Sequence, residues 1–126
     1  MARVVALIPD LMFGSRIQAS LQAAEHEVEL VADPIRLGDR LGDGGGGDPA
    51  ELLIVDLTNA DLDGPGIVES LAGEGRLAQT RTLGFYAHVD TTMRERAQDA
   101  SFDLVVPRSR MAREGAVLVT RLVSVG

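Results

Sequence analysis

Short hydrophobic runs alternate along the chain with longer segments in which hydrophobic residues recur every three or four positions. The short runs are rich in Val, Ile and Leu, as in strands that are covered on both faces. They predict five strands, at 3–8, 27–32, 51–56, 81–87 and 102–107. The longer segments predict helices, at 10–24, 34–41, 63–72, 91–100 and 111–125.

Polar residues at the starts of these helical segments supply local signals for helix termini. Asp10 and Asp63 precede hydrophobic periodic stretches and suit N-caps, and Pro65 suits the first turn after Asp63. Thr92 and Glu95 have the spacing of a capping box for the fourth helix. The glycine-rich stretch 42–49 favours neither helix nor strand, so it predicts a flexible surface loop.

The order of these elements predicts the fold class. Five strand–helix units imply a parallel sheet covered by helices on both sides. Right-handed crossovers then favour a doubly wound α/β sandwich of the flavodoxin-like type, with strand order 2-1-3-4-5. At 126 residues, the chain is expected to form this fold as one domain, 1–126.

Composition excludes several classes of function. The net charge is −7, which argues against a nucleic-acid surface, because phosphates are held chiefly by clustered positive charge. There is no cysteine, hence no thiolate metal site, and no hydrophobic run approaches the roughly 20 residues that cross a bilayer. We therefore expect a cytoplasmic protein that does not bind membranes. All 12 basic residues are arginine, so chemistry that needs a lysine ammonium is excluded.

Ligands of doubly wound folds bind at the carboxyl edge of the sheet, which directs attention to the residues after each strand. The candidate residues at that edge are Ile8, Pro9, Asp10, Asp56, Tyr86, Pro107 and Arg108. Asp56 is the natural centre of such a site, because it ends the most uniformly hydrophobic run, ELLIVD.

Three stretches together resemble the receiver domain of two-component response regulators, over essentially the whole chain. DLTNADLDG (56–64) is similar to the phosphoacceptor aspartate and the loop that follows it. FYAHVD (85–90) is similar to the exit of the fourth strand, and AQDASFDLVVPRS (97–109) to the passage into the fifth strand and its catalytic lysine. The resemblance implies a signalling module in which Asp56 holds the phosphoacceptor position.

The family pattern is broken at the other functional positions. The acidic pair that holds Mg²⁺ in receivers falls on Ile8 and Pro9, with Asp10 one position late. The position of the small hydroxyl residue holds Tyr86. The lysine position holds Pro107, with Arg108 as the nearest cation. Because these groups act on the same charge, we expect an atypical receiver that is not an enzyme and needs no cofactor; Asp10 and Asp56 remain as candidate Mg²⁺ ligands.

Two other functions remain open from the sequence. The first is a working phosphoacceptor, phosphorylated on Asp56 by a histidine kinase, with Asp10 and Arg108 replacing the usual groups. The second is a degenerate dinucleotide-binding domain, because residues 4–34 read as a βαβ unit with Asp33 near a ribose-binding position. Only Gly14 fits the glycine fingerprint of such a domain. A structural reading is open too: Asp56 could accept backbone N–H bonds and pair with Arg108.

The last helix carries a hydrophobic arc of roughly 160°, wider than the stripe of about 100° that one buried face needs. We expect part of it to bind a protein partner or a second copy of the chain, giving a dimer; deep seating in the core is the alternative. The expected interaction surface is Leu118, Val119, Leu122 and Val123. Tyr86 is either a rotameric switch or a packing residue, and His26 and His88 are expected in solvated loops.

Overall fold

The computed structural model describes residues 2–41, 49–59 and 61–124, so all but one residue of the predicted glycine-rich loop lies outside them. The strands are β1 (Arg3–Leu7), β2 (Glu27–Val31), β3 (Leu52–Asp56), β4 (Arg81–Tyr86) and β5 (Leu104–Pro107). The helices are α1 (Leu11–Ala23), the 3₁₀ turn η1 (Pro34–Arg36), α2 (Leu37–Arg40), α3 (Gly64–Gly73), α4 (Thr91–Asp99) and α5 (Arg108–Ser124). None of the described helices is both long and apolar enough to cross a membrane.

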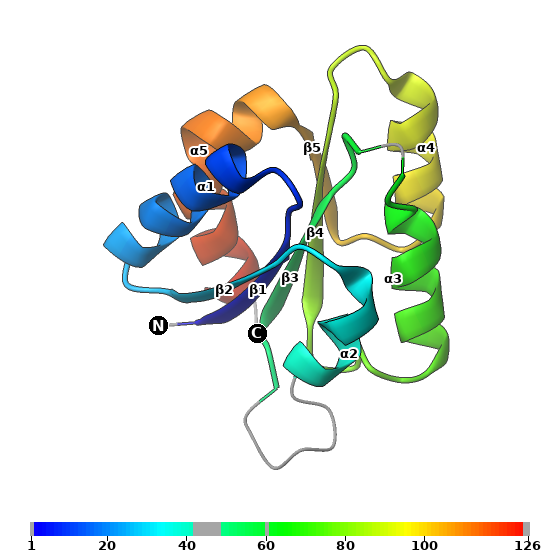
Figure 1. Cartoon of the computed structure of the whole chain (residues 1–126), viewed down its shortest axis with the longest axis horizontal. Coiled ribbons are helices and arrows are strands. Elements are labelled where there is room, and N and C mark those ends of the chain that lie inside the picture. The colour runs from blue at the N-terminus through cyan, green and yellow to red at the C-terminus, as the bar shows by residue number, and fades with distance from the viewer. Residues whose placement is uncertain (1, 42–48, 60, 125–126) are drawn as a thin grey trace.

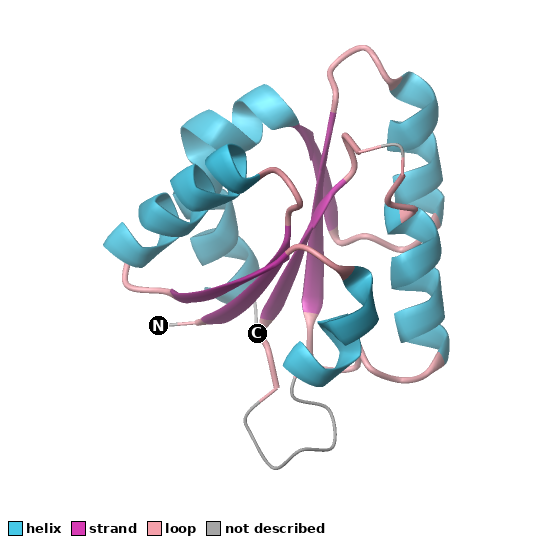
Figure 2. Ribbon diagram, viewed as in Figure 1, coloured by secondary structure: helices cyan, strands magenta, loops and turns pink. Residues whose placement is uncertain are grey.

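The five strands form one parallel sheet in the order β2-β1-β3-β4-β5, which confirms the predicted doubly wound fold (Figure 1). Helices α1 and α5 cover one face, and α2, α3 and α4 cover the other (Figure 2). Alternate residues of each inner strand enter the two cores: Val4 and Ala6 pack toward α1 and α5, while Val5 and Leu7 pack toward α3 and α4. Every residue of β3 is buried, as expected for a central strand.

Aspartate caps begin three of the α-helices. Asp10 and Asp63 cap α1 and α3, as predicted, because each side chain accepts a hydrogen bond from a backbone N–H three residues later. The predicted capping box of Thr92 and Glu95 is wrong: Asp90 caps α4 and accepts a hydrogen bond from Met93 N. An earlier aspartate therefore takes the cap and places both residues inside the helix.

Helix α5 begins at Arg108, three residues before the predicted start, and directly follows the strand residue Pro107. Proline has no N–H to donate and a fixed φ, so it can end a strand immediately before a helix. The early start brings Arg108 into the first turn of α5 and orients it toward α1, where it contacts Phe13 and Asp10.

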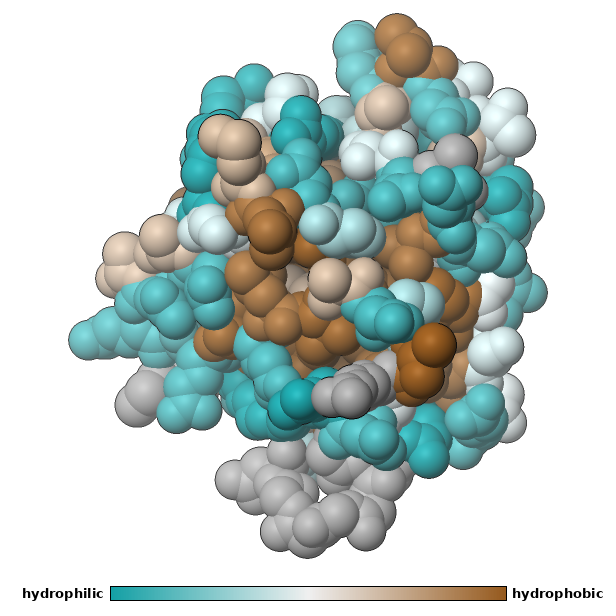
Figure 3. All heavy atoms as spheres, viewed as in Figure 1, coloured by the Kyte–Doolittle hydropathy of each residue, from teal (hydrophilic) through white to brown (hydrophobic). Residues whose placement is uncertain are grey.

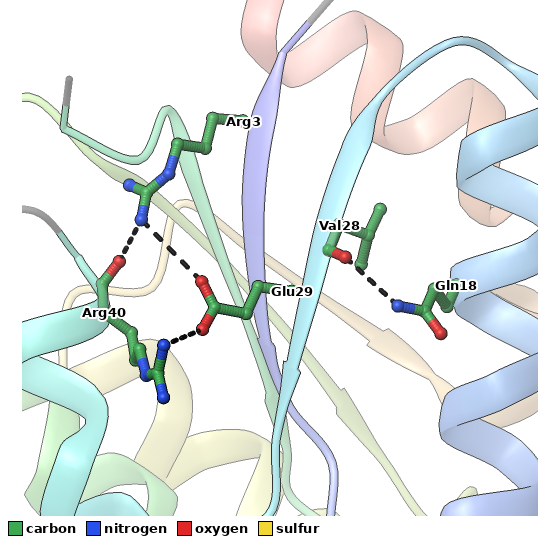
Figure 4. Close-up of polar contacts among 5 residues, drawn as sticks. All are labelled: Arg3, Gln18, Val28, Glu29 and Arg40. Atoms are coloured by element: carbon green, nitrogen blue, oxygen red, sulfur yellow. Dashed lines mark hydrogen bonds and ion pairs between the residues drawn. The ribbon is translucent and has the colours of Figure 1, made fainter. Parts of the chain in front are cut away.

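The edge strand β2 is held to its neighbours by charged side chains (Figure 4). Glu29 lies between Arg3 of β1 and Arg40 of α2, with ion-pair distances of 3.9 and 2.8 Å, respectively. Arg3 also donates to the carbonyl oxygen of Arg40. On the other side of β2, Gln18 Nε2 of α1 donates to the carbonyl oxygen of Val28 at 3.1 Å. These contacts fix the edge of the sheet between two helices.

Leu57 packs between two glycines just beyond the end of β3. A Cβ atom at Gly64, the first residue of α3, would lie 2.5 Å from Leu57 Cδ2. One at Gly84 in β4 would lie 2.7 Å from Leu57 Cδ1. Both distances are too short for a real side chain, so the glycines allow Leu57 to bury itself. The packing holds the segment after Asp56 against α3 and β4.

Candidate functional site

Asp56 ends β3 at the carboxyl edge of the sheet, and its side chain is engaged locally. The residue is 3% exposed. Its Oδ1 accepts hydrogen bonds from Thr58 N at 2.7 Å and Thr58 Oγ1 at 2.6 Å. The structural alternative left open from the sequence, in which Asp56 accepts a backbone N–H bond, is confirmed. Thr58 was missed as its partner, although an aspartate side chain in a turn commonly accepts from the backbone N–H two residues on.

The cation nearest to the lysine position is engaged elsewhere, so the predicted pairing of Arg108 with Asp56 is wrong. Arg108 Nη2 lies 3.7 Å from Asp10 Oδ2, and its guanidinium carbon lies 4.1 Å from the centroid of the Phe13 ring. The Phe13 ring in turn packs on Phe85, with ring centroids 5.1 Å apart. Arg108 is held in this way because it lies on the side of α5 that faces α1.

Hydrophobic side chains flank Asp56 on both neighbouring strands. Asp56 pairs with Phe85 of β4. On the other side, Val55 pairs with Leu7 of β1, which brings Ile8 beside Asp56. Ile8 and Phe85 are both buried in the core beneath α1 and α5. These two positions on the neighbouring strands therefore supply neither a second acid nor a hydroxyl, and the hydroxyl that does reach Asp56 comes from Thr58 of the following loop.

Tyr86 and Pro107 meet at the last pair of the β4–β5 ladder, as their predicted place at the carboxyl edge requires. Tyr86 is buried in the core beneath α3 and α4, whereas its neighbour Phe85 enters the core on the opposite face of the sheet. The packing prediction for Tyr86 agrees with this burial, and its role as a rotameric switch stays a prediction.

The carboxylates of this edge do not fit a Mg²⁺ site. Among the described residues, no group of three or more His, Asp or Glu side chains could hold a metal ion. Asp10 Oδ1 accepts from Phe13 N as the cap of α1, and its Oδ2 pairs with Arg108. Pro9, which offers no donor and no carboxylate, separates this capping residue from Ile8.

The geometry also argues against a dinucleotide site. Dinucleotide-binding folds place a pyrophosphate at the N-terminus of the first helix, where backbone N–H groups and the helix dipole favour an anion. Here the carboxylate of Asp10 already holds that position and would repel a pyrophosphate. The strand order β2-β1-β3-β4-β5 also differs from the 3-2-1-4-5 core order of the dinucleotide fold.

His26 lies in the connection between α1 and β2, but its side chain is buried and not solvated as expected. Its Nδ1 accepts a hydrogen bond from Ala2 N at 3.2 Å, and its Nε2 lies 3.0 Å from Thr120 Oγ1 of α5. Burial lowers the pKa of His26 below its ordinary value of 6.5. The contacts come from residues far apart in the sequence, so no local pattern could have revealed them. His88 is exposed, as predicted.

The predicted interaction surface on the last helix is largely core. Leu118 and Val119 are buried against the sheet, and Leu122 and Val123 are partly buried against the same cluster. Two of the four residues are therefore unavailable to a partner. The wide hydrophobic arc arises because α5 packs both on the sheet and beside α1. Val117, 50% exposed, is the large hydrophobic residue that α5 does present to solvent.

No protein-family model matches this sequence, and the search of curated proteins also gives no match. Solved structures do match. The chain is similar to the receiver domain of the Francisella response regulator 1452, with a TM-score of 0.82 and 13% identity over 98% of each chain. It is similar to the non-phosphorylated HemR receiver domain from Leptospira biflexa, with a TM-score of 0.79 and 17% identity over 100% of this chain and 97% of that one.

A third similar structure is the chemotaxis response regulator CheY4 of Vibrio cholerae, with a TM-score of 0.77 and 16% identity over 97% of this chain and 98% of that one. These matches span nearly the whole length of both compared chains. The strand order and helix placement described above agree with them. The chain therefore has the CheY-like receiver fold of response regulators.

Proposed function

We propose that this protein is an atypical receiver-like signalling module that acts by binding another protein or a second copy of itself. In this proposal, Asp56 is not phosphorylated in the usual Mg²⁺-dependent way. The receiver fold and the place of Asp56 at the end of β3 support the signalling part. The charges around Asp56 support the second part.

Electrostatics explains why a receiver needs more than one aspartate. Transfer of a phosphoryl group to a carboxylate brings two anions together, so a dication and a positioned cation must neutralise the developing charge. In this chain Ile8 and Phe85 flank Asp56. The single observation that carries the proposal is the Asp10–Arg108 ion pair. In this pair the candidate metal ligand and the candidate cation neutralise each other and not a phosphoryl group on Asp56.

The proposal is tested by incubating the protein with acetyl phosphate and Mg²⁺ and measuring its intact mass. We expect no stoichiometric phosphoryl adduct under conditions that phosphorylate an ordinary receiver domain. The matched control is Asp56→Asn, which removes the acceptor and nearly keeps its size. A full adduct on the wild type that Asp56→Asn fails to form would overturn the proposal. Asp10 and Arg108 would then be the groups to examine as substitutes for the usual ones.

A further inference from the structure

The layer formed by α1 and α5 has the opposite charge from the rest of the protein. These two helices carry five arginines and one glutamate, whereas the whole chain has a net charge of −7. They lie side by side on one face of the sheet (Figure 1). A basic layer on an acidic protein favours encounter with an acidic surface there and disfavours it elsewhere.

A shallow groove of about 290 Å³ runs between the two helices. Its lining combines hydrophobic and small side chains with one arginine: Phe13, Arg16, Ile17, Ala19, Ser20 and Ala112. The short side chains of Ala19 and Ala112 leave space in which a partner's side chain can reach the hydrophobic floor. The groove is remote from pockets near the amino edge of the sheet, which involve neither α1 nor the first half of α5.

Exposed hydrophobic residues and arginines occur together along both helices. Met12, 82% exposed, lies one helical turn before Arg16 on α1. Val117 lies one turn after Arg113 on α5, and Arg113 is itself largely exposed, with Glu114 at 3.7 Å as its ion-pair partner. Arg16 forms no ion pair with any residue in the described part of the chain. Each helix therefore presents one exposed hydrophobic residue and one arginine four positions apart.

We propose that the α1–α5 groove docks an acidic amphipathic helix of another protein. Hydrophobic residues of that helix, spaced three or four apart, would fill the groove, while its Asp and Glu residues would face Arg16 and Arg113. This inference rests on the proposed function, because it names the partner chemistry of an interaction module. Figure 3 shows another hydrophobic surface, which lies between α1 and α2 on the side of the molecule turned to the viewer; the proposal does not involve it.

The test uses a display library of randomised 20-residue helical peptides, selected for binding to the intact protein. We expect the selected peptides to be rich in Asp and Glu, with hydrophobic residues at helical spacing. Arg16→Glu should weaken their binding by about tenfold or more, and salt should weaken it as well. Arg94→Glu is the matched control, because Arg94 is also an exposed helical arginine without an ion pair among the described residues; it should change affinity by less than about twofold.

A second variant tests the groove independently of charge. Ala19→Trp places a large side chain on the exposed wall of the groove, and it should abolish peptide binding while the unfolding midpoint stays close to wild type. The inference is overturned if no peptide binds, if the peptides lack acidic residues, or if Arg16→Glu and Ala19→Trp bind them normally. It is also overturned if the wild type is a dimer that Arg16→Glu dissociates, since a second copy would then cover the groove.

The two proposals fail in distinguishable ways. A phosphoryl adduct at Asp56 together with groove-dependent peptide binding would overturn the proposed absence of phosphorylation and leave the docking surface standing. Absence of both the adduct and the binding would overturn the docking surface alone.

Discussion

Arg108 lies over the ring of Phe13, with its guanidinium carbon 4.1 Å from the ring centroid, so the first residue of α5 contacts the first turn of α1. Asp10 reinforces this contact, because its Oδ2 lies 3.7 Å from Arg108 Nη2. The arrangement joins two helices that β1 and β5 deliver to the same face of the sheet.

Arg108→Ala should lower the free energy of unfolding by about 0.5–1 kcal/mol, because it removes a cation–π contact and an ion pair that are both half exposed to solvent. Arg108→Lys should recover only part of this loss, since an ammonium cannot stack on a ring as a planar guanidinium does. Urea unfolding measures both variants. Arg94→Ala is the control, and equal effects of Arg108→Ala and Arg94→Ala would contradict the assigned contact.

Thr58→Val should destabilise the protein by about 1 kcal/mol, because it removes the hydroxyl that donates to Asp56 Oδ1 and leaves the backbone N–H of residue 58 as the donor among the described residues. Thr58→Ser keeps the hydroxyl and should stay near wild type. Urea midpoints of the two variants give the comparison. If the valine and serine variants unfolded at the same denaturant concentration, the side-chain hydrogen bond would contribute nothing.

Stability should fall as the pH drops below about 6.5, because burial lowers the pKa of His26 in the folded state. The unfolded chain then binds the proton more readily than the folded chain, so protonation favours unfolding. The effect is absent well above pH 6.5 and grows as the pH approaches the lowered pKa of the folded state. The neutral Nδ1 accepts a hydrogen bond from Ala2 N. Once protonated, Nδ1 can no longer accept, and two N–H donors then face each other.

The measurement is the free energy of unfolding between pH 8 and pH 5 for two histidine variants. His26→Gln should flatten this pH dependence, whereas the exposed His88→Gln should keep the wild-type profile. Parallel profiles for wild type and His26→Gln would show that other groups control the response to acid.

Gly84→Ala and Gly73→Ala form a matched pair with opposite expected signs. At Gly84 the new methyl group would lie 2.7 Å from Leu57 and 3.0 Å from the Phe102 ring, so the core must shift at a cost of about 1–3 kcal/mol. At Gly73, near the end of α3, nothing lies within 4 Å, and alanine should stabilise the helix by about 0.5 kcal/mol. Thermal unfolding distinguishes the signs, and a Gly84→Ala variant as stable as wild type would refute the packing argument.

The fold could be predicted because its signals are local and repeated. Each hydrophobic run became a strand of the sheet, and the caps at Asp10 and Asp63 depend on a side chain and an N–H only three residues away. The start of α5 was misplaced because two arginines and a serine hide its first turn from a hydrophobic pattern.

The arrangement around Asp56 could be predicted only in part. The sequence identified the residues that reach the carboxyl edge, but the partner of Arg108 depends on which way α5 faces, and that follows from packing against α1. The burial of His26, Leu118 and Val119 has the same origin, since helical spacing alone cannot show how deeply two neighbouring elements sit.

Leu57 fills the space that the missing side chains of Gly64 and Gly84 leave, so the side-chain volumes at these three positions limit one another. Homologous chains that acquire a bulkier residue at either glycine should carry a smaller one at the position of Leu57, so that substitutions at distant points of the sequence compensate each other. A redesign that places a side chain at either glycine must accordingly also reduce the side chain at position 57.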